Sequence, residues 1–268
     1  MSRLASKFQD LAKSGRKALI PFLTAGDPSP EFTVPMMHDM VKAGVDIIEL
    51  GIPFSDPMAD GPVIQRASER ALAHKVSLRK VLAMAAEFRQ TDQHTPLVFM
   101  GYLNPIEIMG YENFADAAQQ ADIDGVLTVD LPPEEGDEFS ALLKTRGIDP
   151  IFLLAPNSGV DRIKKMDASG SGYLYYVSLK GVTGAGNLNT ADVKIKLQQI
   201  KSATRLPVAI GFGVKNAENA KTLAEIGDAV VVGSALISKI EANLNDPALA
   251  KSEIIALLSA MRQAMDEN

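Results

Sequence analysis

The sequence contains no cysteine, and this absence excludes two kinds of chemistry. Neither a disulfide framework nor a thiolate metal site can form without it. The only histidines, His38, His74 and His94, stand far apart and lack the spacing of a metal-ligand set. We therefore expect no metal site in this chain.

Long apolar runs and basic blocks are also missing. No apolar stretch reaches the roughly 18 residues of a membrane span, and residues 1–17 lack the apolar run of a signal peptide. The net charge is −6, and no Lys/Arg cluster offers a surface for nucleic acid or an anionic membrane. We expect a cytoplasmic protein that binds neither. A phosphorylated substrate is not excluded, because backbone N–H groups bind phosphate without basic side chains.

What the chain does contain is one pattern repeated from end to end. A short apolar or β-branched run is followed by a polar loop and then by a stretch with helical periodicity. Several runs are apolar nearly throughout, as expected of parallel strands covered on both faces. The predicted strands are Ala18–Leu23, Asp46–Leu50, Leu97–Met100, Gly125–Val129, Pro150–Leu154, Tyr173–Val177, Pro207–Ile210 and Ala229–Val232.

This repetition predicts an α/β fold, a (β/α)8 TIM barrel that forms a single domain over residues 1–268. Leu4, Phe8 and Leu11 are spaced as on a helix, so we expect an additional N-terminal helix that covers the bottom of the barrel. The alternative is an open doubly wound sheet. The dinucleotide fingerprint of such sheets is missing after the first strand, where Thr24-Ala25-Gly26-Asp27-Pro28 stands instead.

Polar residues at the carboxyl ends of the strands are the catalytic candidates, because barrel active sites lie there. Glu49 lies inside an apolar strand, where a carboxylate must be paired or have a raised pKa. Asp60 lies near the end of a stiff loop rich in proline and glycine; alternatively, Asp60 or Asp56 caps the following helix or a turn. Asp130 also follows a strand, and a turn-forming role fits it equally well.

Glycines follow the last two strands, at Gly211-Phe212-Gly213 and at Gly233-Ser234. Barrels often bind phosphate there, on backbone N–H groups and on a short helix, which we expect at Ser234–Ile240. The alternative is a pair of tight turns. The glycine-rich segment Ser178–Asn187 is either a loop that closes over a ligand or an ordinary surface loop.

Together these segments resemble the tryptophan synthase α subunit family over about residues 17–240. The block from Glu49 to Gln65, ELGIPFSDPMADGPVIQ, is highly specific. The other matching segments are Pro21-Phe22, Thr24–Pro28, Gly101-Tyr102-Leu103-Asn104-Pro105, Asp130-Leu131-Pro132, Gly181-Val182-Thr183-Gly184, Gly211-Phe212-Gly213 and Gly233-Ser234.

The resemblance implies a lyase of L-tryptophan biosynthesis that splits indole-3-glycerol phosphate into indole and glyceraldehyde-3-phosphate. The general acid–base of the family falls on Glu49, the carboxylate that holds the indole N–H falls on Asp60, and Tyr175 is a lesser helper. Such a retro-aldol cleavage needs a proton on C3 of indole and a base for the glycerol hydroxyl. A second, ionised carboxylate would stabilise the charge that grows at N1.

The resemblance also implies binding residues and partners. No cofactor is expected in this chain, since pyridoxal phosphate belongs to the β subunit of an α2β2 assembly. Some members carry Arg where this chain has Leu179, so a loop latch is missing unless Lys180 replaces it. The indole pocket would be lined by Phe22, Met100, Leu127, Leu153, Tyr175 and Phe212, and the phosphate end by Thr183, Gly184, Gly213, Gly233 and Ser234.

Three alternatives stay open. The first is a stand-alone lyase with the same chemistry and no β partner. The second is another phosphate-binding barrel enzyme, which would not share the block from Glu49 to Asp60. The third is a non-catalytic regulatory subunit that binds a phosphorylated metabolite, in which one of these two carboxyls would be expected to be lost.

Overall fold

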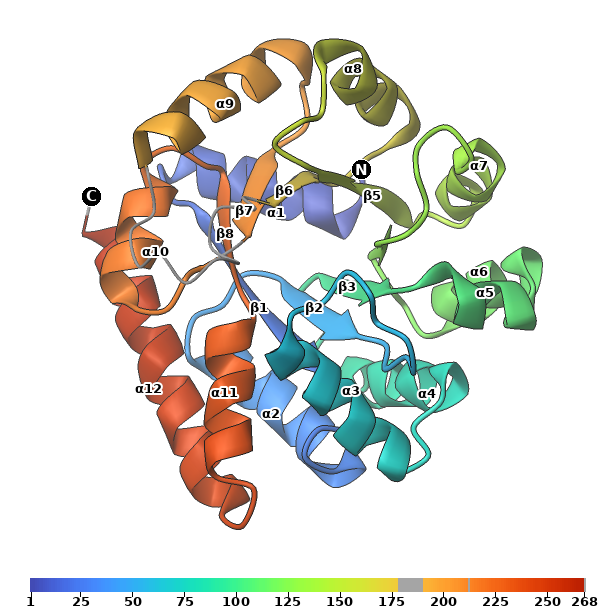
Figure 1. Ribbon diagram of the computed structural model, residues 1–268, viewed down its shortest axis with the longest axis vertical. Coiled ribbons are helices and arrows are strands. Elements are labelled where there is room, and N and C mark those ends of the chain that lie inside the picture. The colour runs from blue at the N-terminus through green and yellow to red at the C-terminus, as the bar shows by residue number, and fades with distance from the viewer. Residues whose placement is uncertain (178–189, 212, 268) are drawn as a thin grey trace.

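The computed structural model describes residues 1–177, 190–211 and 213–267. Eight parallel strands close into a barrel in which each strand pairs with the next and β8 returns to β1 (Figure 1). The predicted barrel is confirmed, and the open sheet is wrong. The strands are β1 (Ala18–Thr24), β2 (Ile48–Gly51), β3 (Leu97–Gly101), β4 (Gly125–Thr128), β5 (Asp149–Leu154), β6 (Leu174–Val177), β7 (Val208–Gly211) and β8 (Ala229–Val232).

The helices surround the strands (Figure 1). They arise where apolar positions recur at helical spacing, and Ser77 precedes α4 at the N-cap position, as its sequence indicates. The helices are α1 (Arg3–Lys13), α2 (Pro30–Lys42), α3 (Pro62–Ala73), α4 (Leu78–Arg89), α5 (Leu103–Met109), α6 (Tyr111–Gln120), α7 (Asp137–Thr145), α8 (Val160–Ser169), α9 (Thr190–Ala203), α10 (Ala217–Ala224), α11 (Ser234–Ala242) and α12 (Pro247–Asp266).

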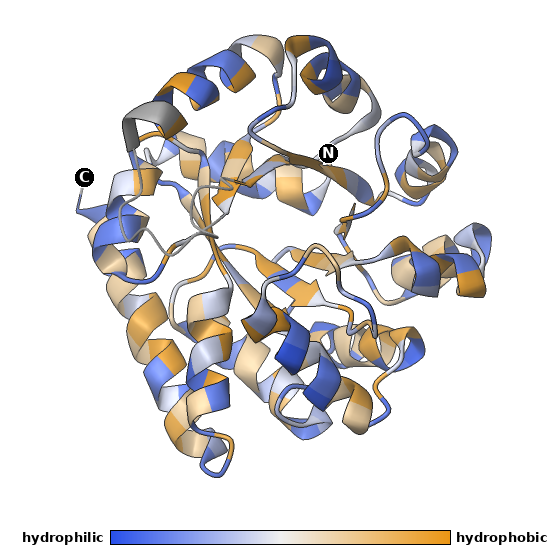
Figure 2. Ribbon diagram, in the orientation of Figure 1, coloured by the Kyte–Doolittle hydropathy of each residue, from blue (hydrophilic) through white to orange (hydrophobic). Residues whose placement is uncertain are grey.

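The strands consist mostly of hydrophobic residues, as their colour in Figure 2 shows, and nearly all of their residues are buried. On β2, Ile48 and Leu50 belong to the apolar layer shared with the helices, whereas Ile47, just before the strand, points into the barrel interior with Val98. Successive side chains of a strand point to opposite faces. Glu49 therefore shares the inward face with Ile47.

Helix α1 closes the barrel at the amino ends of the strands, which confirms the predicted extra helix. Its N-cap is Ser2, whose hydroxyl accepts the N–H of Ala5 at 3.2 Å. Leu4, Phe8 and Leu11 are buried in the barrel interior. Because this end is plugged, a ligand must enter from the carboxyl ends of the strands.

Candidate active site

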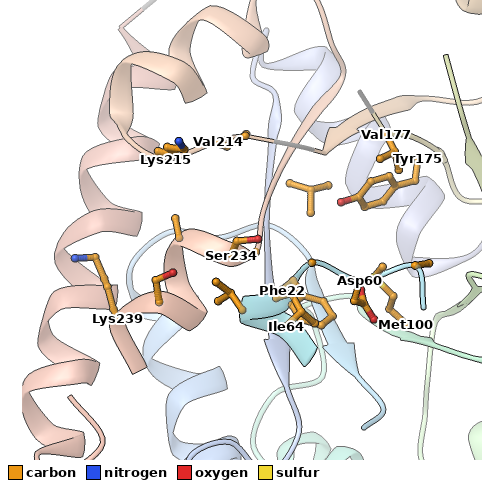
Figure 3. A pocket seen from close by; sticks show the side chains of 18 of the residues that line it. Phe22, Asp60, Ile64, Met100, Tyr175, Val177, Val214, Lys215, Ser234 and Lys239 are labelled. Atoms are coloured by element: carbon orange, nitrogen blue, oxygen red, sulfur yellow. The ribbon is translucent and has the colours of Figure 1, made fainter. Parts of the chain in front are cut away.

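A cavity of about 790 Å³ opens at the carboxyl ends of the strands, a size typical of small-molecule sites. Asp60 and Tyr175 lie at one end of it, and Ser234, Lys239 and Lys215 lie further along (Figure 3). Most of the residues that line it are apolar. Among its lining residues are Phe22, Ala59, Ile64, Met100, Val129, Leu153, Val177, Gly213, Val231 and Gly233.

Glu49 is the buried carboxyl next to this cavity. Its position in β2 is in register with Phe22 of β1, which lines the cavity, and with Val98 of β3. Gly51, two residues further on, leaves space for the ring of Phe22: a Cβ there would lie 2.5 Å from the ring. Glu49, Phe22 and Gly51 thus lie together where β1 and β2 pair.

The surroundings of Glu49 favour its neutral form. The side chain is 0% exposed, and Oε2 has no hydrogen-bond partner among the described residues. Burial raises the pKa of Glu49 to about 8, although the hydroxyl of Tyr173, which donates to Oε1 at 2.5 Å, lowers the pKa somewhat. A carboxyl that is protonated at neutral pH and titrates near pH 8 suits a general acid–base.

Asp60 provides the second carboxyl, and it lies on the wall of the cavity. Burial raises its pKa, and a hydrogen bond from the hydroxyl of Tyr102 to Oδ2, 2.9 Å long, lowers it. The alternative that Asp60 or Asp56 caps α3 is wrong. Gly61 is the N-cap residue, and no side chain caps this helix. The side chain of Asp60 is therefore not used as a helix cap, and its second oxygen, Oδ1, is left for a ligand.

The pKa of Tyr175 in β6 is affected by the charges of both carboxyls, Glu49 and Asp60. Burial raises its pKa well above the usual value, and the negative charges of Glu49 and Asp60 add to this effect. Its ring depends on Gly211 of β7, because a Cβ at that position would stand 1.9 Å from the hydroxyl oxygen. Gly211 thus makes room for Tyr175, whereas its sequence context suggested a phosphate site.

The other part of the cavity has the features predicted for phosphate. Helix α11 begins at Ser234, as expected, and its N-terminal N–H groups have no side-chain cap. Gly213 has a φ of +71°, which favours glycine, and no atom of a neighbouring residue lies within 4 Å of the place a Cβ would take. Free N–H groups and open space are what a phosphate requires.

A buried ion pair ties α11 to the rest of this region. Arg70 of α3 donates to Asp27 at 2.6 Å and 2.9 Å and to Glu241 of α11 at 3.2 Å. Asp27 is 0% exposed and belongs to the segment after β1. The segment Thr24–Pro28 thus helps, through Asp27 and Arg70, to hold α11 in place.

The predicted pocket residues divide into three groups. Phe22, Met100, Leu153 and Tyr175 line the cavity. Leu127, like Glu49, is 0% exposed and is not among the residues that line the cavity; it belongs to the interior cluster against which Met100 and Leu153 pack, and its contact with the indole stays a prediction. The predictions for Thr183, Gly184, Phe212, Leu179, Lys180 and the Ser178–Asn187 loop lie outside the described residues.

The fold also shows the contacts of Asp130, Tyr173 and Tyr102. The side chain of Asp130 accepts the N–H of Leu103, the first residue of α5, at 2.8 Å, so the turn-forming alternative is the better one. Tyr173 and Tyr102, which hold Glu49 and Asp60, were not recognised as site residues. The alternation of Tyr173 and Tyr175 was a usable signal, because residues two apart share one face of a strand.

The described residues contain neither a candidate metal site nor a helix that could span a membrane. Among them, no three side chains of the His, Cys, Asp or Glu type come together as a possible metal site. No helix in this part of the chain is long and apolar enough to span a membrane.

The fold and the cavity together define a (β/α)8 barrel with a small-molecule cavity at the carboxyl ends of its strands and with two carboxyls at or next to that cavity. Comparison with known families assigns it further. The family profile described as "Tryptophan synthase alpha chain" matches residues 8–266. The chain belongs to the tryptophan synthase alpha chain family.

Individual relatives agree over the whole length. The tryptophan synthase alpha chain of Methylococcus capsulatus is 61% identical over 266 residues, which cover 99% of this chain and 100% of the relative. The crystal structure of the alpha subunit from Legionella pneumophila has a TM-score of 0.93 at 47% identity and covers 100% of both chains. A structure of the tryptophan synthase α2β2 complex from Pyrococcus furiosus has a TM-score of 0.85 at 38% identity, covering 92% and 98%.

Members of this family split indole-3-glycerol phosphate into indole and glyceraldehyde-3-phosphate in tryptophan biosynthesis, and the chain is a lyase of this type. The alternatives of another barrel enzyme and of a non-catalytic subunit are therefore wrong. The roles of individual residues and the dependence on a β subunit are separate questions.

Proposed function

We propose that Glu49 and Asp60 divide the chemistry of the cleavage between them. The observation that carries this proposal is the contrast in their surroundings. Glu49 is sealed from solvent with a pKa of about 8, whereas Asp60 lies on the cavity wall and accepts a hydrogen bond that favours its ionised form. One carboxyl can then donate a proton while the other stays charged.

In the first step, protonated Glu49 gives its proton to C3 of the indole ring. C3 becomes tetrahedral, and the positive charge spreads to N1, where the carboxylate of Asp60 accepts the N–H and stabilises it. The C3–C3′ bond then breaks, its electron pair returns to the ring, and the C3′ hydroxyl loses its proton to Glu49 as the aldehyde forms. The enzyme is regenerated with its proton, so no external acid or base is consumed.

Glu49 must turn towards the cavity for this chemistry, because its carboxyl is fully buried against Tyr173. Its backbone lies in register with Phe22, which lines the cavity, and we propose that rotation of the Glu49 side chain brings the carboxyl to the substrate. The unpartnered Oε2 is the atom best placed to deliver the proton, since no described group holds it.

The phosphate end would orient the substrate for these steps. We propose that Gly213, Gly233 and Ser234 bind the phosphate through backbone N–H groups and the Ser234 hydroxyl, together with Thr183 and Gly184. All three described residues line the same cavity as Asp60. Binding energy gained at the phosphate holds the indole between the two carboxyls.

We further propose that the chain acts as a single barrel domain in the cytoplasm, needs no cofactor of its own, and pairs with a pyridoxal-phosphate-dependent β subunit in an α2β2 complex. Two carboxyls suffice for the proton transfers described above, which supports the absence of a cofactor. The related Pyrococcus furiosus protein, described as part of such a complex, supports the partner.

The test is to incubate the purified chain with indole-3-glycerol phosphate and measure both products, in buffer without added cofactor and with a metal chelator present. We expect indole and glyceraldehyde-3-phosphate in equal amounts. Product formation that requires an added metal or cofactor would contradict the proposal.

A further inference from the structure

The hydroxyl of Tyr102 joins two consecutive residues of the loop that carries Asp60. It donates to Oδ2 of Asp60 at 2.9 Å and accepts the backbone N–H of Ala59 at 3.0 Å. Tyr102 directly follows β3 and is only 3% exposed, whereas Met58 of the same loop is 87% exposed. One hydroxyl therefore connects an exposed loop to the rigid end of a strand.

Tyr102 is itself held from both sides. Its ring stacks on Phe54, with 5.2 Å between the ring centroids and 28° between the planes. It is the N-cap residue of α5, and the next N–H, that of Leu103, is held by Asp130 at 2.8 Å. The side chain thus contacts the loop at Phe54, Ala59 and Asp60, while the backbone of the next residue, Leu103, is held by Asp130 after β4.

This arrangement occupies one oxygen of Asp60 and leaves the other for a ligand. In the described part of the chain, Tyr102 is the side chain that donates to this carboxylate. The other titratable groups nearby are Tyr175 of β6, which is affected by the charge of Asp60, and Asp130, which acts on Tyr102. None of these neighbours is a cation, so the ionised form of Asp60 depends on hydrogen bonding in a buried place.

We propose that Tyr102 is a positioning residue of the cleavage reaction, whose hydroxyl aims Asp60 at the indole N–H and keeps it ionised. This inference rests on the proposed role of Asp60. The hydrogen bond from Tyr102 offsets part of the rise in the pKa of Asp60 that burial causes. Aim and charge thus come from one contact, made by a residue that does not itself need to touch the substrate.

Tyr102→Phe removes the hydroxyl and keeps the ring, so the stacking on Phe54 and the burial persist. We expect kcat/KM to fall about 10-fold at neutral pH, equivalent to about 1.4 kcal/mol at the barrier. The pKa of Asp60 rises when the hydrogen bond is lost. Since Asp60 must be ionised, the acidic limb of the kcat/KM profile moves to higher pH.

The chain offers a matched control in Tyr111→Phe. The hydroxyl of Tyr111 also donates to a carboxylate, Glu107 at 3.1 Å, but on the exposed surface of the neighbouring helices and not on the cavity. The same atom is removed from the same kind of contact. Kinetics of this variant should match those of the unmodified chain.

The experiment compares the unmodified chain, Tyr102→Phe, Asp60→Ala, the double variant and Tyr111→Phe over a range of pH, with thermal unfolding recorded for each. If Tyr102 acts through Asp60, Tyr102→Phe has no further effect in the Asp60→Ala background. A loss of equal size in both backgrounds, an unmoved acidic limb, or unchanged activity of Tyr102→Phe would overturn the inference. Near-normal activity of Asp60→Ala would instead overturn the proposed role of Asp60, and the inference with it.

Discussion

The hydroxyl of Tyr173 lies 2.5 Å from Oε1 of Glu49 and is the hydrogen-bond donor of this buried carboxyl. The two residues are 124 positions apart in the sequence and meet across the barrel interior. Tyr173 is 0% exposed, and burial together with the charge of Glu49 raises its own pKa well above the usual value. It therefore stays protonated and can only donate, which stabilises the anionic form of Glu49.

This contact leads to a prediction for the pH dependence. Tyr173→Phe removes the one interaction that lowers the pKa of Glu49, so this pKa rises above about 8. Glu49 must be protonated to donate to C3, and activity is lost as the pH rises through its pKa. The alkaline limb of kcat/KM should therefore move to higher pH in the variant. A limb that stays in place or moves to lower pH would show that Glu49 is not the group that titrates.

The role of Asp60 is tested by Asp60→Asn, which keeps the shape and removes the charge. Turnover should fall by about 10²- to 10³-fold, as for loss of other groups that stabilise charge in a transition state. Binding of glycerol phosphate, measured by calorimetry, should barely change, because the phosphate end of the cavity is formed by other residues. If phosphate affinity falls as much as turnover does, Asp60 has a structural role instead.

Much of this architecture could be predicted from the sequence because parallel strands buried on both faces are short apolar runs. The run around Ile47 and Ile48 shows this, as one residue faces inward and the next faces the helices. A carboxyl in such a run, Glu49, is conspicuous for the same reason. The helix α1 was predictable because Leu4, Phe8 and Leu11 fall on one face.

Contacts between distant segments could not be predicted. Nothing near Tyr102 in the sequence indicates that its hydroxyl meets Asp60, 42 residues away. Whether Asp60 caps α3 was equally undecided, since the N-cap position of Gly61 depends on the backbone path of the loop. For Leu127 the resemblance gives the position but not the depth at which its side chain packs, which is in the barrel interior.

The phosphate site is tested by Gly213→Val. A valine there would place its side chain in the cavity and adopt a φ of about +71° at a cost in stability. Gly147→Val is the matched control, because Gly147 has a φ of +75°, also faces open space, and does not line the cavity. Both variants should lose similar stability.

Only Gly213→Val should lose the protection that phosphate gives against heat, since bound ligand stabilises the folded state by mass action. The measurement is the melting temperature with increasing glycerol phosphate. Equal protection of both variants would place the phosphate elsewhere.

A further prediction concerns the β subunit. The loop that carries Asp60 has exposed residues at Asp56 and Met58, and a partner docked on the barrel mouth would cover them and favour the loop conformation that suits catalysis. We expect the chain alone to turn over slowly and a matched β subunit to raise kcat 10- to 100-fold. This activation needs only about 1.4–2.7 kcal/mol at the barrier. Titration of the partner with indole release as readout decides it: unchanged turnover at saturation would favour a stand-alone lyase.

The stability of Glu49→Gln provides the control for the most direct test. Glu49 has a higher pKa in the folded chain, about 8, than in an unfolded one, near 4.5. Its contribution to stability is therefore fully present below about pH 4.5 and is lost as the pH rises through about 8. Glutamine mimics the protonated form, so the variant should unfold at the same temperature as the unmodified chain in acid. At pH 8 and above, its unfolding temperature should be at least as high.

The central claim, that Glu49 transfers the proton that breaks the C3–C3′ bond, is tested most directly by the rate of indole release from Glu49→Gln. The rate should be measured at neutral pH with saturating indole-3-glycerol phosphate and a β subunit present. We predict a loss of at least about 10²- to 10⁴-fold, the usual range for a general acid–base, in a variant that remains folded. Indole release within a few-fold of the unmodified chain would contradict the assignment.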